Sequence, residues 1–165
     1  MNLGFYFEKL HSSEVFIDFM EKNPKAYLCS GFFSIDKEGQ DNQKHFDFYA
    51  PDEKKMFSFK LESKIEKVPM EIFEAVPKVL DIDSNLDFDI DDTEKILLEK
   101  MEEQKINNKI QKILISIQNV EEKNFLICTV FISGLGLLKV QIDLKTKKIT
   151  FFEKKSFFDF VKRVK

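Results

Sequence analysis

The alternation of apolar and polar positions is clearest between Lys112 and Phe152. Residues 112–118 place an isoleucine at every second position from Ile113 to Ile117, which is the period of a strand with one buried face. Residues 125–132 are apolar at nearly every position, so we expect this strand to be covered on both faces, at least locally. Alternation returns in 137–144, and residues 149–152 complete an antiparallel meander with strand 125–132 at its centre.

The connections within this meander are short and polar. Residues 120–124 are charged, residues 145–147 are polar, and the connection Ser133–Gly136 contains two glycines that can adopt positive φ angles in a turn or a bulge. A nucleotide-binding glycine loop has a third glycine and is followed by a helix, and both are missing here. We therefore interpret this connection as a turn.

The N-terminal part shows both the two-residue period of strands and the helical period of three to four residues. Leu3, Phe5 and Phe7 alternate and predict a first strand over residues 3–9. Ser12 or Ser13 then caps a helix that ends at Asn23-Pro24 and has one apolar side. Three strands are predicted next, and Pro69 to Pro77 delimit a short helical stretch. The apolar side of the first helix is Val15, Phe16, Phe19 and Met20, and the three strands are residues 26–35, 44–49 and 56–61.

Two further helices are predicted in the C-terminal part. Asp91 and Glu94 have the spacing of a capping box, so a helix is expected from there to about Asn108, with an Asp91–Lys95 ion pair on its surface. Ser156 would cap a last helix, in which apolar residues recur at helical spacing. Its apolar stripe is Phe157, Phe160, Val161 and Val164.

The fold class that these elements predict is α+β, with an antiparallel meander sheet or sheets packed against a few amphipathic helices. The order of elements is similar in residues 12–62 and 93–152, which suggests two similar halves without a residue-level repeat. We expect one domain over residues 1–165, with possible sub-units 1–63 and 93–165 joined by 64–92. The strand order and the number of sheets stay open.

The composition argues against nucleic-acid and membrane partners. The chain has 165 residues, a net charge of −3 and only one arginine, Arg163, among 26 basic residues. It therefore lacks both a basic field and the guanidinium groups that favour phosphate recognition, so we expect no nucleic-acid partner. The 19 phenylalanines, with abundant Ile, Asn and Lys, are typical of an AT-rich coding sequence. Without a signal peptide or a long apolar run, the protein is expected to be cytoplasmic with no membrane partner.

The two cysteines, Cys29 and Cys128, lie in apolar, strand-like runs with no second cysteine or histidine nearby in the sequence. Free cysteine is among the most buried residue types. We therefore expect both to be reduced core residues.

The hairpin KVQIDLKTKKITFFE carries a family resemblance. Together with the preceding helix and strands, over roughly residues 93–152, it resembles the PepSY type of cystatin-like module, in which an Asp-x-x-Thr-Gly-Lys turn joins the last two strands. Asp143, Thr146 and Lys148 match that turn, whereas Lys147 stands where the family has glycine. The resemblance implies a binding or inhibitory module rather than an enzyme.

The acidic stretch Asp81–Asp92 allows two interpretations. Asp81, Asp83, Asn85 and Asp87 fall at the ligand positions of a calcium loop, although Leu86 replaces the glycine of its sharp turn and Asp92 replaces the final glutamate. Alternatively, residues 86–91 alternate as a short edge strand with a solvated acidic face. The edge strand is the simpler interpretation, because Leu86 would strain a calcium loop.

His45, Asp47 and Tyr49 share one face of a predicted strand and combine a base, an acid and a hydroxyl group. General acid–base catalysis needs a convergent geometry that sequence spacing does not establish, and an exposed polar sheet face has the same pattern. A basic tail, comprising Lys154, Lys155, Lys162, Arg163 and Lys165, could contact phosphate groups, but Lys162, Arg163 and Lys165 are instead expected to complement the C-terminal end of the last helix.

No catalytic motif, cofactor site or metal site is predicted. We expect a non-catalytic module that binds another protein, or itself as a homodimer, through a sheet edge, a sheet face or a helix. The alternative is a small-ligand or enzymatic pocket between helix and sheet, with His45, Asp47 or Tyr49 at its mouth.

Overall fold

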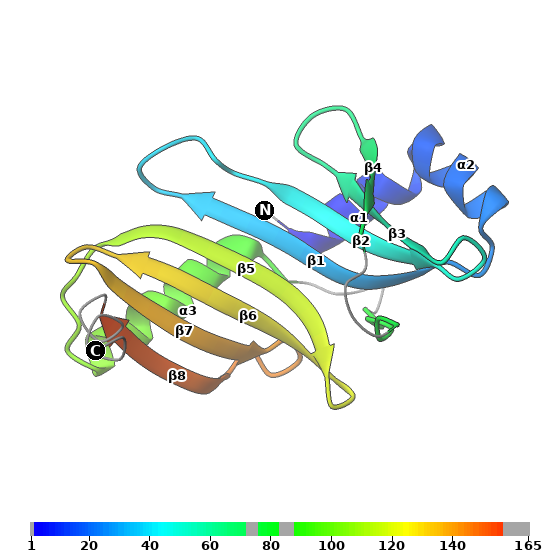
Figure 1. Cartoon of the computed structure of the whole chain (residues 1–165). Helices are drawn as coiled ribbons and strands as arrows, with labels where there is room; N and C mark the ends of the chain where they lie inside the picture. The colour runs from blue at the N-terminus through cyan, green and yellow to red at the C-terminus, as the bar shows by residue number, and fades with distance from the viewer. Residues whose placement is uncertain (1, 72–75, 83–87, 157–165) are drawn as a thin grey trace, which may run out of the picture.

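A computed structural model describes residues 2–71, 76–82 and 88–156 of the chain (Figure 1). Within them, eight strands form one sheet in the order β4-β3-β2-β1-β5-β6-β7-β8, and all neighbouring strands are antiparallel. The fold is therefore α+β, as predicted. The strands are β1 (Tyr27–Asp36), β2 (Lys44–Ala50), β3 (Lys55–Lys60), β4 (Glu66–Met70), β5 (Ile110–Val120), β6 (Lys123–Ile132), β7 (Gly136–Asp143) and β8 (Ile149–Ser156).

Three helices are described, and all of them place their buried side chains in one core with the sheet. They are α1 (Leu3–His11), α2 (Glu14–Lys22) and α3 (Ile90–Glu103). Figure 1 shows α1 and α2 beside the N-terminal strands and α3 running across β5 to β8. We call the opposite side of the sheet the open face, because no described helix covers it.

The strand order divides the sheet into two halves at its centre. The N-terminal half comprises α1, α2 and β1 to β4, and the C-terminal half comprises α3 and β5 to β8. In each half the strands run outward in sequence order, and β1 pairs with β5 where the halves meet, from Gly31–Ile117 to Asp36–Lys112. One sheet thus spans both predicted sub-units, and β4 lies inside the segment 64–92 that was expected to join them.

Aromatic rings fill the core of the N-terminal half. Phe16 and Phe19 of α2 lie over rings from β2 and β3, with ring centroids 5.1–6.4 Å apart. All of these pairs are T-shaped or tilted, which suits the quadrupoles of the rings. Gly31 leaves room for this layer, since a Cβ atom there would lie 3.1 Å from the ring of Phe46.

Aliphatic side chains fill the core of the C-terminal half. Ile113, Ile115 and Ile117 of β5 are fully buried, as the alternation in this strand predicts. They pack with apolar residues of β6 and β7 and with Leu97 and Met101 of α3. Cys128 lies in this layer and Cys29 in β1, and both are buried free thiols, as expected.

The predicted strand over residues 3–9 is wrong, because this segment is the helix α1. Asn2 caps the helix by accepting a hydrogen bond from the Gly4 amide at 2.8 Å. Leu3, Tyr6 and Leu10 are buried at helical spacing, whereas Phe5 is 61% exposed. The apparent alternation of phenylalanines therefore concealed a period of three to four.

The predicted helical start at Pro69 is also wrong. Pro69 lies in the edge strand β4, where it pairs with Phe57. An edge strand tolerates proline because the missing amide can face away from its one neighbour. Residues 72–75 of the predicted helical stretch lie outside the described residues, and so does the predicted last helix beyond Ser156.

Helix α3 differs from its prediction at both ends. Its N-cap is Asp89, which accepts a hydrogen bond from the Asp91 amide at 2.9 Å, and its last residue is Glu103 rather than about Asn108. Lys105 has a φ of 58°, which a helix cannot continue through. Lys95 lies near Asp92, at 3.7 Å, instead of forming the predicted pair with Asp91.

Candidate functional site

The chemically mixed residues of the sequence meet on the open face of the N-terminal half. Phe46 and Phe48 of β2 point into the core, so His45, Asp47 and Tyr49 point to the open face. Asp47 is only 5% exposed there. A buried carboxylate is costly unless hydrogen bonds satisfy it, so its partners decide what this cluster can do.

Asp47 uses both carboxylate oxygens within the sheet. Its Oδ2 accepts a hydrogen bond from the Ser30 hydroxyl at 2.7 Å, and its Oδ1 lies 2.9 Å from Nδ1 of His45. The imidazole ring stacks on Phe32, with centroids 5.1 Å apart. Tyr49 does not join these hydrogen bonds, and its ring packs edge-on against Tyr27. The structure thus brings together two of the three predicted residues and adds Ser30.

The order of these contacts differs from that of a hydrolytic triad. In a triad the imidazole lies between the hydroxyl and the carboxylate, so that it can remove the hydroxyl proton. Here the carboxylate lies between Ser30 and His45, and the hydroxyl donates directly to it. The arrangement orients the ring of His45 but does not activate Ser30 as a nucleophile.

Cys29 adjoins this cluster at a β-bulge between Leu28 and Ser30. Its thiol donates a hydrogen bond to the backbone carbonyl of Asp47 at 3.2 Å. Burial, and then the charge of Asp47, raise the pKa of this thiol to about 12. Burial alone raises the pKa of Cys128 to about 12. Reactive cysteines need a low pKa and access to solvent, so neither thiol fits a nucleophilic role.

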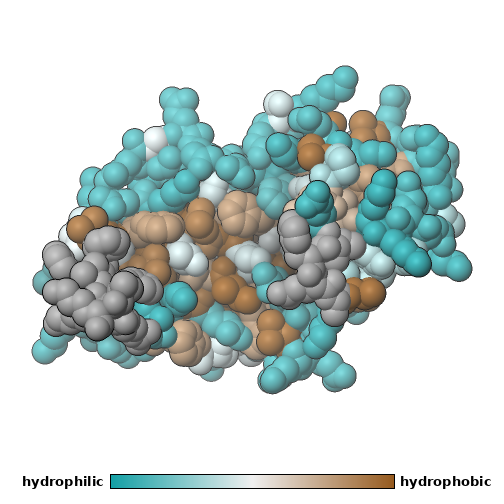
Figure 2. Space-filling model, in the orientation of Figure 1, coloured by the Kyte–Doolittle hydropathy of each residue, from teal (hydrophilic) through white to brown (hydrophobic). Residues whose placement is uncertain are grey.

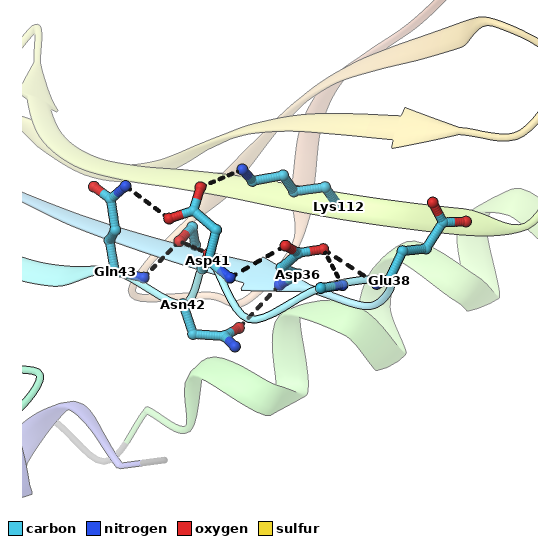
Figure 3. Close-up of polar contacts among 8 residues, drawn as sticks. Asp36, Glu38, Asp41, Asn42, Gln43 and Lys112 are labelled. Atoms are coloured by element: carbon cyan, nitrogen blue, oxygen red, sulfur yellow. Dashed lines mark hydrogen bonds and ion pairs between the residues drawn. The ribbon is translucent and has the colours of Figure 1, made fainter.

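The acid-rich β1–β2 loop is a second polar cluster (Figure 3). The Asp36 carboxylate accepts hydrogen bonds from three loop amides, those of Glu38, Gly39 and Asp41, at 2.9–3.2 Å. Those bonds, the one from Asp41 first, lower the pKa of Asp36. Asp41 reaches Lys112 of β5 at 2.5 Å, which lowers the pKa of Asp41 and raises that of Lys112. The Asp36 carboxylate thus stabilises the turn, and the Asp41 carboxylate connects it to β5 in the other half of the sheet.

The acidic stretch Asp81–Asp92 is described only at its ends. Phe88 is fully buried, Asp89 forms an isolated bridge with Asn2, and Ile90 begins α3, so residues 88–90 are not the predicted edge strand. The calcium ligands proposed at positions 83, 85 and 87 lie outside the described residues. In the part of the chain that the structure describes, no group of three His, Cys, Asp or Glu residues is placed to hold a metal ion.

The open face of the C-terminal half is apolar instead. Phe131 of β6 pairs with Leu137 of β7, and both point to this face. Phe131 is 39% exposed and Phe151 of β8 is 49% exposed. Figure 2 shows hydrophobic side chains gathered over the middle of this view, with hydrophilic ones around them. Strand 125–132 thus has two apolar faces, as its sequence indicates, but no described helix covers the second one.

The turn between β6 and β7 adds an unusual residue to this surface. Gly134 and Leu135 have φ angles of 79° and 58°, so the expected turn at Ser133–Gly136 is confirmed. A non-glycine residue in the left-handed region loses about 1–2 kcal/mol through contacts of its Cβ atom. Leu135 is 64% exposed, so burial in the monomer offsets little of that cost. We call Phe131, Leu135 and Leu137 the hairpin patch.

Sequence reasoning identified the polar residues more readily than this patch. His45 and Asp47 stand out by residue type, whereas Ser30 joins them from another strand through pairing that a single sequence does not reveal. The signal for the hairpin patch was present in the second apolar face of residues 125–132. It was interpreted as a covered face, because an apolar strand in the middle of a sheet is normally covered.

The comparisons with known proteins bear on the fold alone. No protein-family model matches the chain, and no curated protein matches it. The fold is similar to that of a solved structure from Clostridium difficile 630, titled a "putative lipoprotein", with a TM-score of 0.58 over 86% of this chain and 91% of that one. The sequence identity is 12%, which shows a shared fold and nothing about function.

No helix in the described residues combines the length and the apolarity that a membrane span requires.

In the hairpin that resembles the PepSY turn, Asp143 accepts hydrogen bonds from the amides of Lys145 and Thr146 at 2.8 and 3.1 Å. Lys147, which stands where that family has glycine, has a φ of 61°. The turn thus has the backbone for which glycine is suited, and membership of the family stays a prediction.

Proposed function

We propose that this protein is a non-catalytic module that binds another protein through the open face of its C-terminal half. The observation that carries the proposal is the hairpin patch, an apolar surface without a covering helix among the described residues. Soluble proteins keep large apolar side chains at such positions mainly where another surface covers them. Leu135 strengthens the argument, because strained backbone positions concentrate at functional sites.

Affinity capture tests this proposal. The tagged protein is incubated with native extract at moderate salt, and bound proteins are quantified by mass spectrometry. We expect one protein at near-stoichiometric yield, and a several-fold lower yield with Leu135→Asn. Asparagine tolerates the left-handed region, so this variant removes the apolar side chain without endangering the turn.

The control variant is Leu98→Asn, which alters another exposed leucine, 49% accessible to solvent, on α3 and away from the patch. Equal yields from the wild-type protein and both variants would contradict the proposal. Self-association, measured by light scattering on the same samples, would instead identify the second copy as the partner, provided that Leu135→Asn abolishes it.

The alternative function is a ligand-binding or enzymatic site around His45. It is supported by the His45–Asp47 contact, because a carboxylate at Nδ1 holds the ring and leaves Nε2 available for a ligand or a proton. A small-molecule thermal-shift screen tests it. Ligands that raise the melting temperature of the wild-type protein but not that of His45→Ala would support this function, and their absence would leave the protein-binding module as the better account.

A further inference from the structure

The hairpin patch is bordered by four lysines that come from three separate segments of the sequence. Lys112 of β5 pairs with Phe131, and Lys155 of β8 pairs with Leu137, so one row across the sheet reads Lys, Phe, Leu, Lys. Lys139 follows two residues after Leu137 on the same face. Lys109 lies beside the turn, where its amide and carbonyl both bond Ser133 at 2.8–2.9 Å.

These lysines differ in whether they form an ion pair with an acidic side chain of the protein. Lys112 has Asp41 at 2.5 Å, and Lys155 has Glu153 at 3.5 Å. Lys109 and Lys139 are exposed and form no ion pair with the described residues. Among the described residues, the patch therefore has two exposed lysines without an ion pair at its border, of which Lys139 has Glu153 as its cross-strand neighbour, although the whole chain carries a net charge of −3.

We infer that the hairpin patch binds a protein segment that presents an apolar side chain between acidic ones. The apolar residue covers Phe131 and Leu137 beside Leu135, and the flanking carboxylates lie near Lys109 and Lys139. Complementary charge around an apolar centre selects the partner and sets its orientation. This inference rests on the proposed function and specifies the class of partner.

A lipid surface fits the same observations less well. Stable attraction to anionic membranes usually takes clusters of four to eight basic residues or a long apolar anchor. Here one leucine protrudes at the turn, Phe131 and Leu137 lie within the sheet, and two of the four neighbouring lysines already have acidic partners. A peptide segment needs only a small apolar contact with a charge on either side.

Fluorescence anisotropy with labelled hexapeptides tests the inference on the full-length protein. The probe is EELFEE, and the matched controls are KKLFKK and EEAAEE. We expect EELFEE to bind at least tenfold more tightly than either control, and more weakly as salt rises, because exposed charges are screened. Equal binding of EELFEE and KKLFKK, or no binding of EELFEE at millimolar protein, would overturn the inference.

Variants locate the binding. Leu135→Asn should weaken EELFEE binding about tenfold while the melting temperature stays equal or rises, and Lys109→Glu with Lys139→Glu should reverse the preference toward KKLFKK. Lys145→Glu, in the exposed β7–β8 turn, is the charge control and should reduce EELFEE binding by less than twofold. An unchanged preference in the double lysine variant would show that the charges do not select the partner.

Two results separate this inference from the proposed function. If the wild-type protein captures a partner that Leu135→Asn loses, but EELFEE does not bind, the protein-binding function holds and the acidic class is wrong. If the protein sediments with phosphatidylserine vesicles and binds neither a captured protein nor EELFEE, both proposals are wrong and the patch contacts lipid.

Discussion

The two halves of this sheet share one architecture and differ in what they bury and display. Each half has helices on one face and four strands that run outward from the centre. The N-terminal half has an aromatic core and a hydrogen-bonded polar cluster on its open face, whereas the C-terminal half has an aliphatic core and an apolar open face. Similar arrangements of helices and strands thus carry different outward-facing residues in the two halves.

The comparison shows that residue type in the sequence does not reveal which side chains the fold buries and which it exposes. His45 and Asp47 look catalytic in the sequence, yet Asp47 is buried and its oxygens are used within the sheet. Phe131 and Leu137 look like core residues, yet they point to the open face. A candidate site is better recognised by large apolar side chains that the fold leaves exposed, or by buried polar groups that it leaves without hydrogen bonds.

The largest expected effects come from removing one core side chain in each half. Phe59→Ala should lower the free energy of unfolding by about 3–5 kcal/mol, and Ile115→Ala by about 2–5 kcal/mol, because both side chains are fully buried. Urea denaturation followed by both circular dichroism and tyrosine fluorescence measures these losses. Because β1 pairs directly with β5, we expect the two signals to change together in both variants. Separate transitions would mean that the halves unfold independently.

A second comparison uses the one cysteine in each half. Burial raises the pKa of both thiols from the ordinary value of 9.0 to about 12 in the folded protein. The unfolded chain therefore releases these protons first, so stability is full below pH 9 and falls as the pH rises above it. Between pH 8 and pH 10 we expect a loss of about 1.4 kcal/mol for each thiol.

The variants Cys29→Ala and Cys128→Ala isolate this effect. Each variant lacks one of the two thiols, so its loss of stability between pH 8 and pH 10 should be smaller than that of the wild-type protein by about 1.4 kcal/mol. This difference does not depend on how much the substitution itself changes stability at pH 8. Denaturation midpoints at the two pH values, compared among the wild-type protein and the two variants, give the result. The same loss in all three proteins would show that the thiols ionise as readily in the fold as outside it.

The polar cluster of the N-terminal half should matter for stability. Asp47→Asn replaces one carboxylate oxygen by a donor, so either Ser30 or His45 loses its acceptor at a buried position. We expect a loss of about 1–3 kcal/mol. As a control on the C-terminal half, Gln118→Ala on the exposed part of β5 should change stability by less than about 0.5 kcal/mol. Similar losses of stability in Asp47→Asn and Gln118→Ala would show that the hydrogen bonds of Asp47 do not stabilise the fold.

The smallest effect is a gain of stability at one position in α3. Thr93 is fully buried, and its hydroxyl has no hydrogen-bond partner among the described residues. Thr93→Val keeps the shape and removes the unsatisfied group, so we expect the protein to gain about 1 kcal/mol. A thermal melt measures it. A clear loss of stability would mean that the hydroxyl is hydrogen-bonded in solution.

Hydrophobic periodicity predicted the C-terminal half well. The alternation in residues 112–118 and 137–144 places the buried side chains of β5 and β7 correctly, because each of these strands has one covered face. The same reasoning failed for residues 3–9, where frequent phenylalanines produced alternation by chance on a helix. An aromatic-rich composition weakens periodicity as a signal, because apolar residues then occupy exposed positions as well.

Pairing between distant strands was beyond the sequence. Neither the join between β1 and β5 nor the contact of Ser30 with Asp47 follows from local pattern, since both depend on the register of strands that are far apart in the chain. The hairpin patch was missed for a different reason. Two apolar faces on residues 125–132 predict cover on both sides of the sheet, and no helix among the described residues covers the second one.

Hydrogen–deuterium exchange would test most directly whether the C-terminal half carries the interaction. The bead-bound protein, with and without its captured partner, is exchanged and analysed by mass spectrometry. The account predicts slower exchange in residues 129–139 of the bound protein, because a partner on the hairpin patch restricts the opening of β6 and β7. Slower exchange confined to residues 44–50, around His45 and Asp47, would contradict it and move the functional site to the N-terminal half.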